Sequence, residues 1–322
     1  MEQDFKELEE GPGKKVADNC GVRLWRVMPS NCVLSGNYMK HWQKLRDFPA
    51  TDGDIWVISQ PKSGTTWTQE MSWLLGHNCD FETAKKVPLD FRMPHIEHQV
   101  IVRSEEGVNS LQQLLDMPAP RYIKCHLPME LLPQQIWKTK AKIIYVARDP
   151  KDVAVSYYHY MRTCYGYSGS IDDFLEAFLD ESLPYGPYWA HVLGYWKLRH
   201  QPNVLFTTYE EMKRDLPAAV RRCARFMSAD VSEDLLQKLV DHLSFDNMKT
   251  NPAVNKEGYV AAVRKGMGLD PNAADLPRFM RRGQPGGWRN EFPPGFAERF
   301  DKWIQEKTSG TGYTVGISGG HA

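Results

Sequence analysis

The stretch from 54 to 75 constrains the fold most narrowly, because it sets a short polar loop between a predicted buried strand and a predicted helix. The strand is the apolar run at 55–59, and the helix carries Trp67, Met71 and Leu74 on one face. The loop reads PKSGTTW and combines a lysine, a glycine and three hydroxyl side chains. Such a loop before a helix N-terminus is typical of a phosphate-binding site. The nucleotide-triphosphatase motif G-x-x-x-x-G-K-S/T is absent, so the sequence leaves the anion open at this point.

Four short apolar or β-branched runs predict a buried parallel sheet. They lie at 55–59, 121–124, 142–147 and 203–209. Three of the intervening helices are predicted to begin at capping residues, namely Asp149, Ser170 and Ser232. The alternation predicts a single α/β domain over 1–322, with a central parallel sheet, helices on both faces and a P-loop-like phosphate-binding loop. Beyond the helix after the loop, the predicted helices lie at 150–162, 170–181, 216–226, 232–243 and 296–306.

Four segments lack a regular pattern. The stretches 79–120 and 250–290 are rich in proline, or in glycine, proline and arginine, and are predicted to be irregular. Loops this long in a compact domain are usually functional or disordered. Residues 1–50 form an N-terminal segment with no predicted elements, and 307–322 form a predicted irregular tail.

The composition excludes several classes of protein. Forty basic residues balance forty acidic ones, which argues against a nucleic-acid or membrane-surface partner. No apolar run reaches the roughly 18 residues of a membrane span, and the acidic N-terminus is unlike a signal peptide. The six cysteines form no C-x-x-C pair, so we expect a cytoplasmic protein with reduced, buried thiols.

Two candidate anion sites follow predicted strands. In the loop, Gly64 allows close backbone approach to an anion, and Lys62 adds positive charge; the alternative is an ordinary turn with an incidental lysine. Lys124 and His126 lie two residues apart at the end of the second strand, so both point the same way. His126 is a candidate general base, although an isolated histidine is more often a satisfied core residue.

Two arginine patches complete the set. Arg148 follows the third strand, with Ser156 on the next helix; the pair suits phosphate binding, although Arg148 has Asp152 as an alternative partner. A glycine-rich loop near the C-terminus predicts a second anion clamp rather than a solvated basic loop. We find no paired carboxylates beside the first loop, so no metal is expected. The arginines of the C-terminal loop are Arg278, Arg281, Arg282 and Arg289.

These motifs together resemble a known family. PKSGTTW, KCHLP, VARDPKDVAVSYYH and FMRRGQPGGW are similar, in order and spacing, to the signature of the cytosolic sulfotransferases. The resemblance runs from about 54 to about 303 and implies 3′-phosphoadenosine 5′-phosphosulfate (PAPS) as the donor and PAP as the product. It implies a sulfotransferase that moves a sulfuryl group to a hydroxyl of a small, largely apolar acceptor by in-line displacement.

The resemblance also implies residue roles. His126 would take the acceptor proton, Lys62 would stabilise the leaving oxygen, and Lys124 would stabilise the sulfuryl group, with Ser156 beside them. Trp67 and Phe245 would sandwich the adenine. The complete donor site would comprise Lys62, Ser63, Gly64, Thr65, Thr66, Trp67, Arg148, Ser156, Tyr209, Leu243, Phe245, Met280, Arg281, Arg282 and Gly283.

The sequence departs from the family pattern in three places. Arg282 and Gly287 replace a lysine and an aspartate of the glycine-rich motif, and Leu243 stands where a threonine is frequent. The C-terminal dimer motif K-x-x-x-T-V-x-x-x-E survives only as Lys307 and Thr311, so a homodimer formed through it stays open.

The acceptor site is expected to draw on the segment PLDFRMPHIEH. Alignment on its second proline puts His95 and His98 where phenol-sulfating members place two phenylalanines. If they face inward, acceptors with a second polar group, or bulkier ones, should be favoured over small flat phenols. The residues predicted for acceptor binding are Phe91, Met93, His95, His98, Lys124, His126 and Tyr160.

Three other functions stay open from the sequence. A nucleotide kinase or related P-loop phosphotransferase lacks its G-K-S/T and metal carboxylates here. A PAPS-binding protein without turnover would not need both Lys62 and His126. Sulfation of an allylic alcohol followed by elimination would give dehydration instead of a stable ester.

Overall fold

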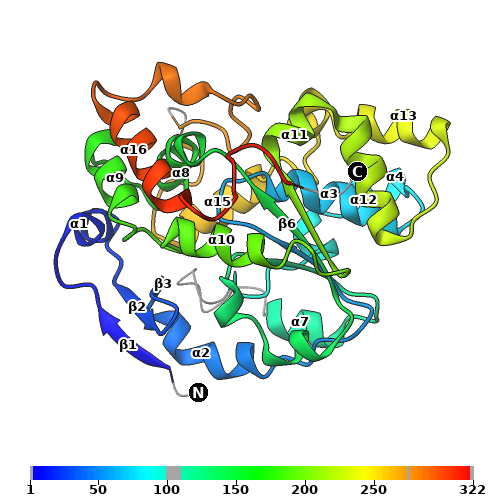
Figure 1. Ribbon diagram of the computed structural model, residues 1–322, viewed down its shortest axis with the longest axis horizontal. Coiled ribbons are helices and arrows are strands. Elements are labelled where there is room, and N and C mark those ends of the chain that lie inside the picture. The colour runs from blue at the N-terminus through cyan, green and yellow to red at the C-terminus, as the bar shows by residue number, and fades with distance from the viewer. Residues whose placement is uncertain (1–2, 99–109, 274–275, 320–322) are drawn as a thin grey trace.

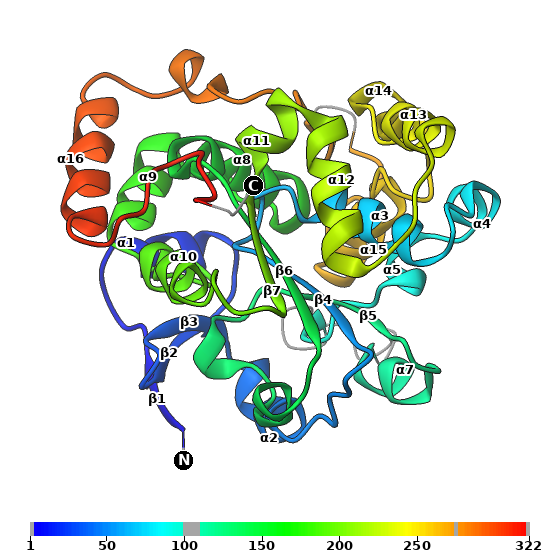
Figure 2. The same ribbon diagram turned by 45° about the vertical axis from the view of Figure 1, so that its right-hand side comes forward.

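The centre of the computed structural model is a four-stranded parallel sheet in the order β5-β4-β6-β7 (Figures 1 and 2). The structure describes residues 3–98, 110–273 and 276–319. Ile55 lies opposite both Tyr122 and Lys142, so β4 is an inner strand. The parallel sheet predicted from the four apolar runs is therefore confirmed. The strands are β4 (Ile55–Ile58), β5 (Tyr122–Cys125), β6 (Lys142–Ala147) and β7 (Val204–Thr208).

Helices cover both faces of this sheet, as predicted. Alternate residues of each strand enter different cores: Trp56 and Ile58 pack on one side, and Ile55 and Val57 on the other. The first core receives α8 (Pro150–Tyr165), α9 (Ile171–Leu179), α10 (Tyr188–Lys197) and α16 (Phe296–Thr308). The second receives α3 (Thr65–Gly76), α11 (Tyr209–Arg214), α12 (Leu216–Met227), α13 (Glu233–His242) and α14 (Phe245–Thr250).

The predicted capping residues stand where the helices begin. The Asp149 carboxylate accepts a hydrogen bond from the Lys151 backbone N–H at 2.8 Å, with Pro150 in the first helical position. Ser170 and Ser232 accept in the same way from the third residue of α9 and of α13. Local sequence therefore sets the starts of these helices before tertiary packing contributes.

The N-terminal 50 residues contain regular elements that the sequence analysis did not predict. An antiparallel sheet comprises β1, β2 and β3, with Phe5 opposite Val27. Two helices accompany it and pack against the main domain (Figure 2). The bounds are β1 (Asp4–Glu7), α1 (Pro12–Asn19), β2 (Leu24–Met28), β3 (Cys32–Ser35) and α2 (Asn37–Arg46).

The stretches predicted to be irregular also contain helices, which corrects that expectation. One of these helices, α4 (Phe81–Lys86), begins at a capping residue. Asp80 accepts a hydrogen bond there from the Thr83 N–H at 3.0 Å. Residues 99–109 and 274–275 of these stretches lie outside the described residues. The helices are α4 (Phe81–Lys86), α5 (Leu89–Arg92), α7 (Ser110–Asp116), α15 (Glu257–Gly266) and the 3₁₀ turn η3 (Gly287–Asn290).

The C-terminal tail is mostly irregular, as predicted, yet it is packed. The Trp196 indole N–H donates to the Thr311 carbonyl at 3.1 Å, and the Tyr313 ring lies 5.1 Å from the Trp196 ring.

Two further 3₁₀ turns, η1 (Met129–Leu131) and η2 (Gln134–Lys138), join β5 to β6. Within the described ranges, the helices are too short or too polar to cross a membrane.

Candidate functional site

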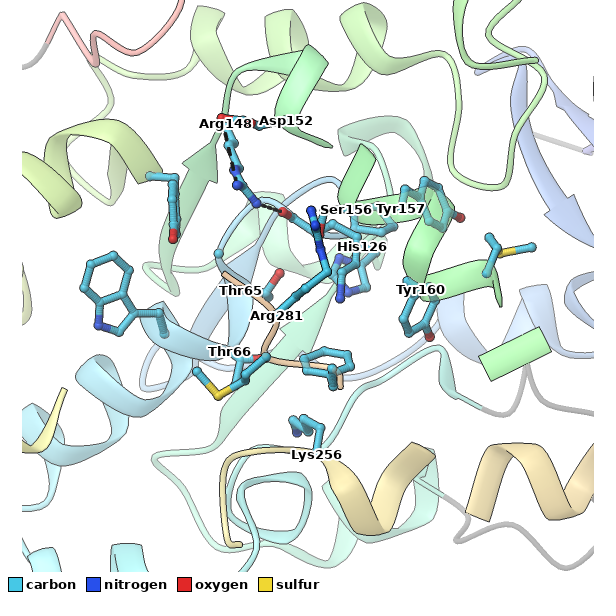
Figure 3. A pocket seen from close by; sticks show the side chains of 18 of the residues that line it. Thr65, Thr66, His126, Arg148, Asp152, Ser156, Tyr157, Tyr160, Lys256 and Arg281 are labelled. Atoms are coloured by element: carbon cyan, nitrogen blue, oxygen red, sulfur yellow. Dashed lines mark hydrogen bonds and ion pairs between the residues drawn. The ribbon is translucent and has the colours of Figure 1, made fainter. Parts of the chain in front are cut away.

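All four strands of the parallel sheet end at one cavity. The chain leaves β4 toward Lys62, β5 toward His126, β6 toward Arg148 and β7 toward Tyr209, and these four residues all line the cavity. Ligands of open α/β sheets bind at this edge, outside the carboxyl ends of the strands. Figure 3 shows Arg148, Arg281 and Ser156 converging on the pocket from separate elements.

The loop after β4 is shaped around Gly64. This glycine caps α3 with φ 105°, in the left-handed region, and a Cβ there would lie 2.8 Å from Cδ2 of Tyr209. Ser63 is fully buried, and its hydroxyl has no hydrogen-bond partner within the described residues. A buried hydroxyl without a partner at a helix N-terminus fits an anion that the protein binds.

Lys62 enters the cavity beside two aromatic rings. Its ammonium group lies 3.7 Å from the centre of the Phe279 ring and 4.7 Å from that of Tyr160. Burial is the main reason that the pKa of Lys62 is lowered to about 7, and the nearby Lys124 and Arg148 contribute to this shift. A bound anion would favour the charged form of this lysine.

Arg148 is positioned by backbone and aromatic contacts. It donates to the Lys62 carbonyl at 3.0 Å and lies 4.3 Å from the centre of the Tyr209 ring. Its nearest approach to Asp152 is 4.0 Å. Asp152 instead accepts from the backbone N–H groups of Gly286 and Trp288, at 2.6 and 3.2 Å. The alternative in which Arg148 serves only Asp152 is therefore disfavoured, and Asp152 orders the glycine-rich loop.

The second arginine patch carries an unpredicted carboxylate. Glu291 lies 2.6 Å from Arg281 and 3.1 Å from Arg282, and its other oxygen lies 2.5 Å from His159 Nε2. Burial would raise the pKa of Glu291, but hydrogen bonds from His159 and Arg281 outweigh burial and hold it at about 2. Glu291 belongs to no quoted motif, and His159 ends the motif VARDPKDVAVSYYH but received no predicted role. Glu291 fixes the arginines that face the cavity.

Aromatic side chains form a separate part of the cavity wall. The Trp67 indole N–H donates to the Leu243 carbonyl at 2.9 Å, and its ring lies 5.6 Å from that of Tyr209. A Cβ on Gly283 would lie only 2.1 Å from the Phe245 ring, so backbone and ring are in direct contact. Trp67, Tyr209, Leu243, Phe245 and Gly283 all line the cavity, together with Met280 and Arg282.

His126 has the tautomer that a general base requires. Its Nδ1 lies 2.7 Å from the Ser59 carbonyl, so Nδ1 carries the proton and Nε2 is left as an acceptor without a partner among the described residues. Burial lowers the pKa of His126 well below its usual value, and Lys124 and His95 add to this effect. The ring is therefore neutral at pH 7 and able to accept a proton.

The backbone of His126 is fixed on both sides. Its N–H donates to the buried Glu97 carboxylate, and its carbonyl accepts from His191 Nε2 at 3.0 Å. The Tyr145 hydroxyl in turn donates to His191 Nδ1 at 2.8 Å. These contacts fix the backbone of His126, and the Ser59 carbonyl orients its ring, which supports a catalytic position rather than a satisfied core histidine.

Four of the seven residues predicted for acceptor binding line the cavity, and three do not. His95, Lys124, His126 and Tyr160 line the cavity, and burial, reinforced by Lys256, lowers the pKa of Lys124 to about 8. His98 does not line it, although its ring lies 5.8 Å from that of Tyr259, which does.

Phe91 and Met93 require correction. Phe91 is 52% exposed on the solvent side of α5, and Met93 is fully buried in the second core. Helix α5 turns Asp90 into the cavity instead. The prediction failed because it assigned a single inward face to a segment that forms a helical turn.

Sequence reasoning missed several residues of the cavity wall. Lys256 and Asp90 form an ion pair there, at 2.6 Å. Apolar side chains of the N-terminal sheet also contribute, and neither group belongs to a motif that the sequence could reveal. Within the described part of the chain, no cluster of three or more His, Cys, Asp or Glu could hold a metal ion. The N-terminal residues of the wall are Val22, Leu24, Leu34 and Ser35.

Comparison with known proteins identifies the family. The family model of the sulfotransferase domain, which describes the sequences of that family, matches residues 52–312 of this chain. The chain belongs to the sulfotransferase family. The predicted family, fold class and enzyme class, a PAPS-dependent sulfotransferase acting on a hydroxyl acceptor, are confirmed.

Curated sulfotransferases align over most of this chain. It is 41% identical to luciferin sulfotransferase of Photinus pyralis, over 88% of this chain and 79% of that protein. It is 35% identical to human sulfotransferase 1E1, over 85% and 90% of the two chains.

Solved structures of other proteins are also similar. A retinol dehydratase in complex with androsterone and inactive cofactor PAP superposes with a TM-score of 0.88, at 28% identity over 98% of both chains. A mouse sulfotransferase in complex with PAP superposes with a TM-score of 0.70, at 28% identity over 90% and 96%.

Proposed function

We propose that this sulfotransferase transfers the sulfuryl group of PAPS to a hydroxyl of a small, largely apolar acceptor, with His126 as general base. One observation carries the proposal: His126 Nε2, a bare acceptor on a neutral ring, belongs to the same cavity as Lys62 and the loop around Gly64. The general base and the anion-binding loop thus line the same cavity.

The donor half of the cavity fits PAPS. The loop from Lys62 to Thr66 begins α3 and offers backbone N–H groups, the unpartnered Ser63 hydroxyl and a lysine to the 5′-phosphosulfate. Arg148, whose buried Nε has no partner within the described residues, would bind the 3′-phosphate with Ser156 and Arg281. PAPS supplies an electrophilic sulfur with a stable phosphate as leaving group.

The adenine fits between the aromatic residues. Trp67 and Phe245 would stack on its two faces, as the resemblance implied, while Tyr209 and Leu243 would meet its edge. Trp67 is fixed by its hydrogen bond to the Leu243 carbonyl, so part of this platform exists before the nucleotide binds.

The transfer step assigns one task to each residue. His126 Nε2 removes the acceptor proton as the oxygen attacks sulfur in line with the bridging oxygen. Lys124 stabilises charge on the sulfuryl oxygens. Lys62 and the N–H groups of the loop stabilise the bridging oxygen as its bond to sulfur breaks. Burial of these groups makes each charge interaction stronger than in water.

The acceptor half is largely apolar. The N-terminal sheet and helix α8 supply much of this wall, which suits a ligand with a ring or hydrocarbon frame. Its apolar side chains include Val22, Leu24, Leu34, Tyr157 and Met161.

A screen with PAPS against phenols, steroids, aliphatic alcohols and allylic alcohols tests this function. We expect transfer to at least one class, and none from ATP with Mg²⁺. Phosphorylation of the same acceptors by ATP, without transfer from PAPS, would overturn the proposal in favour of a phosphotransferase.

Dehydration is the second candidate outcome. The similarity to a retinol dehydratase, with a TM-score of 0.88, favours including it. In this reaction the sulfate formed on an allylic alcohol leaves again, so the product is an alkene and free sulfate. Mass spectrometry of the allylic product decides between this outcome and a stable ester.

The remnants of the dimer motif serve contacts within the chain. Lys307 lies 2.7 Å from Glu181, and the Thr311 hydroxyl donates to the Thr308 carbonyl at 2.6 Å. These contacts support a protein that does not dimerise through this motif. Light scattering at micromolar concentration measures the mass, and a dimer abolished by Lys307→Ala would contradict this view.

A cytoplasmic location agrees with the thiols. All six cysteines are free and buried, and disulfides are rare in a reducing compartment. Fractionation of the native cells tests the location, and recovery from an oxidising compartment would contradict it.

A further inference from the structure

An ion pair between a buried lysine and a half-exposed aspartate stands in the acceptor half of the cavity. The Lys256 ammonium lies 2.6 Å from Asp90 Oδ1, and its side chain is only 4% exposed. Lys256 precedes α15 and Asp90 belongs to α5, and both residues line the cavity. Figure 3 shows Lys256 on the opposite side of the pocket from Arg148 and Asp152, away from the predicted 3′-phosphate site.

The backbone of Lys256 is unusual. Its φ of +66° lies in the left-handed region, which is costly for a residue with a Cβ and is preferred by glycine. A lysine at this helix cap is therefore not explained by backbone preference. Observed outliers of this kind often occur at ligand-binding positions, where the side chain is what the site requires.

The charges around the pair restrict its ligand. Lys124 on β5 is the other cation of this wall, and the proposed mechanism uses it for the sulfuryl group. His95 and His98 are the titratable neighbours on the segment after α5, and burial lowers the pKa of both, so they are neutral at pH 7. Tyr259 of α15 and Tyr160 of α8 contribute hydroxyls 3.2 Å apart.

The remaining ion pair does not suit a charged ligand group. A carboxylate next to Lys256 would also meet Asp90, and an ammonium next to Asp90 would also meet Lys256. An uncharged hydroxyl satisfies both residues, because it accepts from one of the two unused Lys256 protons and donates to Asp90.

We propose that the Lys256–Asp90 pair selects acceptors that carry a second, uncharged hydroxyl group in addition to the hydroxyl that is sulfated. This inference rests on the proposed function, because it takes the neighbouring His126 as the base. The acceptor class is thus a largely apolar diol or bisphenol, with one hydroxyl at His126 and the other at the pair.

Matched acceptors test the inference. Para-substituted phenols and the corresponding longer biphenyl alcohols are compared with hydroxyl, methyl, carboxylate or aminomethyl as the far substituent. We expect kcat/KM of the wild type to favour hydroxyl over methyl by about tenfold or more in at least one series, as for a hydrogen bond to a charged group. Lys256→Met and Asp90→Asn should each reduce this ratio severalfold. Lys265→Met, an exposed lysine of the same helix, is the control and should keep the ratio.

A pair that only fastens α5 to α15 would give a different result. Lys256→Met would then lower the melting temperature while the hydroxyl-to-methyl ratio stayed as in wild type, which overturns the inference. Preference of the wild type for the carboxylate or aminomethyl members would also overturn it.

Failure of the proposed function is separately visible. If no phenol were sulfated although PAP bound, the catalytic assignment would fall. Calorimetry would still measure the affinity of the PAP-bound protein for the hydroxyl and methyl members, which tests the Lys256–Asp90 pair without turnover. Equal affinities would overturn the inference.

Discussion

Replacing Gly283 with alanine should weaken nucleotide binding through the Phe245 ring. Gly283 has φ +64°, and an added Cβ would lie 2.1 Å from Cδ2 of Phe245. Ordinary contacts between such carbon atoms are about 3.5–4.0 Å. The ring, proposed to stack on the adenine, must therefore move by more than an ångström or turn out of its plane.

The size of the effect follows from the contact that is lost. Stacking of a base on an aromatic side chain contributes about 1–3 kcal/mol. Loss of one face therefore weakens PAP binding by roughly fivefold to a hundredfold, since about 1.4 kcal/mol corresponds to tenfold. The left-handed backbone adds a stability cost of about 1–2 kcal/mol, which concerns folding and not the nucleotide.

A matched glycine separates these two effects. Gly310 has φ +73°, but a Cβ there would meet nothing within 4 Å, and it lies outside the cavity wall. Gly310→Ala should thus show a comparable loss of thermal stability with PAP affinity unchanged by calorimetry. If Gly283→Ala bound PAP within twofold of Gly310→Ala, Phe245 would not support the adenine, and the proposed sandwich would be wrong.

Three further results are expected. His126→Ala should lower kcat by roughly 10²–10⁴ with PAP binding retained; because the pKa of His126 is depressed below 6.5, wild-type kcat/KM should show no acid-side loss above that pH, so an acid limb centred above pH 7 would point to another base. PAP should bind far more tightly than AMP, and Arg281→Ala should reduce that preference by roughly tenfold or more, whereas equal affinities of the wild type for both nucleotides would refute a second phosphate site. His95→Phe should raise kcat/KM for simple phenols relative to polyhydroxylated acceptors by a few-fold to about tenfold, but His98→Phe should not; an unchanged ratio in His95→Phe would separate His95 from acceptor choice.

The sheet and the donor side of the cavity were predictable because their signals are local. Each strand is a continuous apolar run, and capping residues such as Asp149 mark helix starts through contacts within a few residues. Gly64 was recognisable because its backbone conformation admits few other residues. Chemistry that depends on backbone conformation and neighbouring sequence is therefore readable from the chain alone.

The acceptor side was not predictable because its contacts are long-range. Lys256 meets Asp90 across 166 positions of sequence. On the donor side the contact of Glu291 with His159 was missed for the same reason, since it spans 132 positions. No spacing rule connects such residues. The error at Phe91 has a related cause, since a four-residue helix is too short to show a periodic pattern.

The antiparallel sheet at the N-terminus places part of the cavity wall outside the region that identifies the family. Leu24 and Leu34 meet the acceptor half of the cavity, yet they precede the region 52–312 by which the family is recognised. The recognised region contains the parts that handle the nucleotide, and these are common to the reaction. In the proposed function, substrate choice therefore depends in part on β2 and β3. We expect that grafting β2 and β3 from a relative would change the acceptor preference and leave the use of PAPS unchanged.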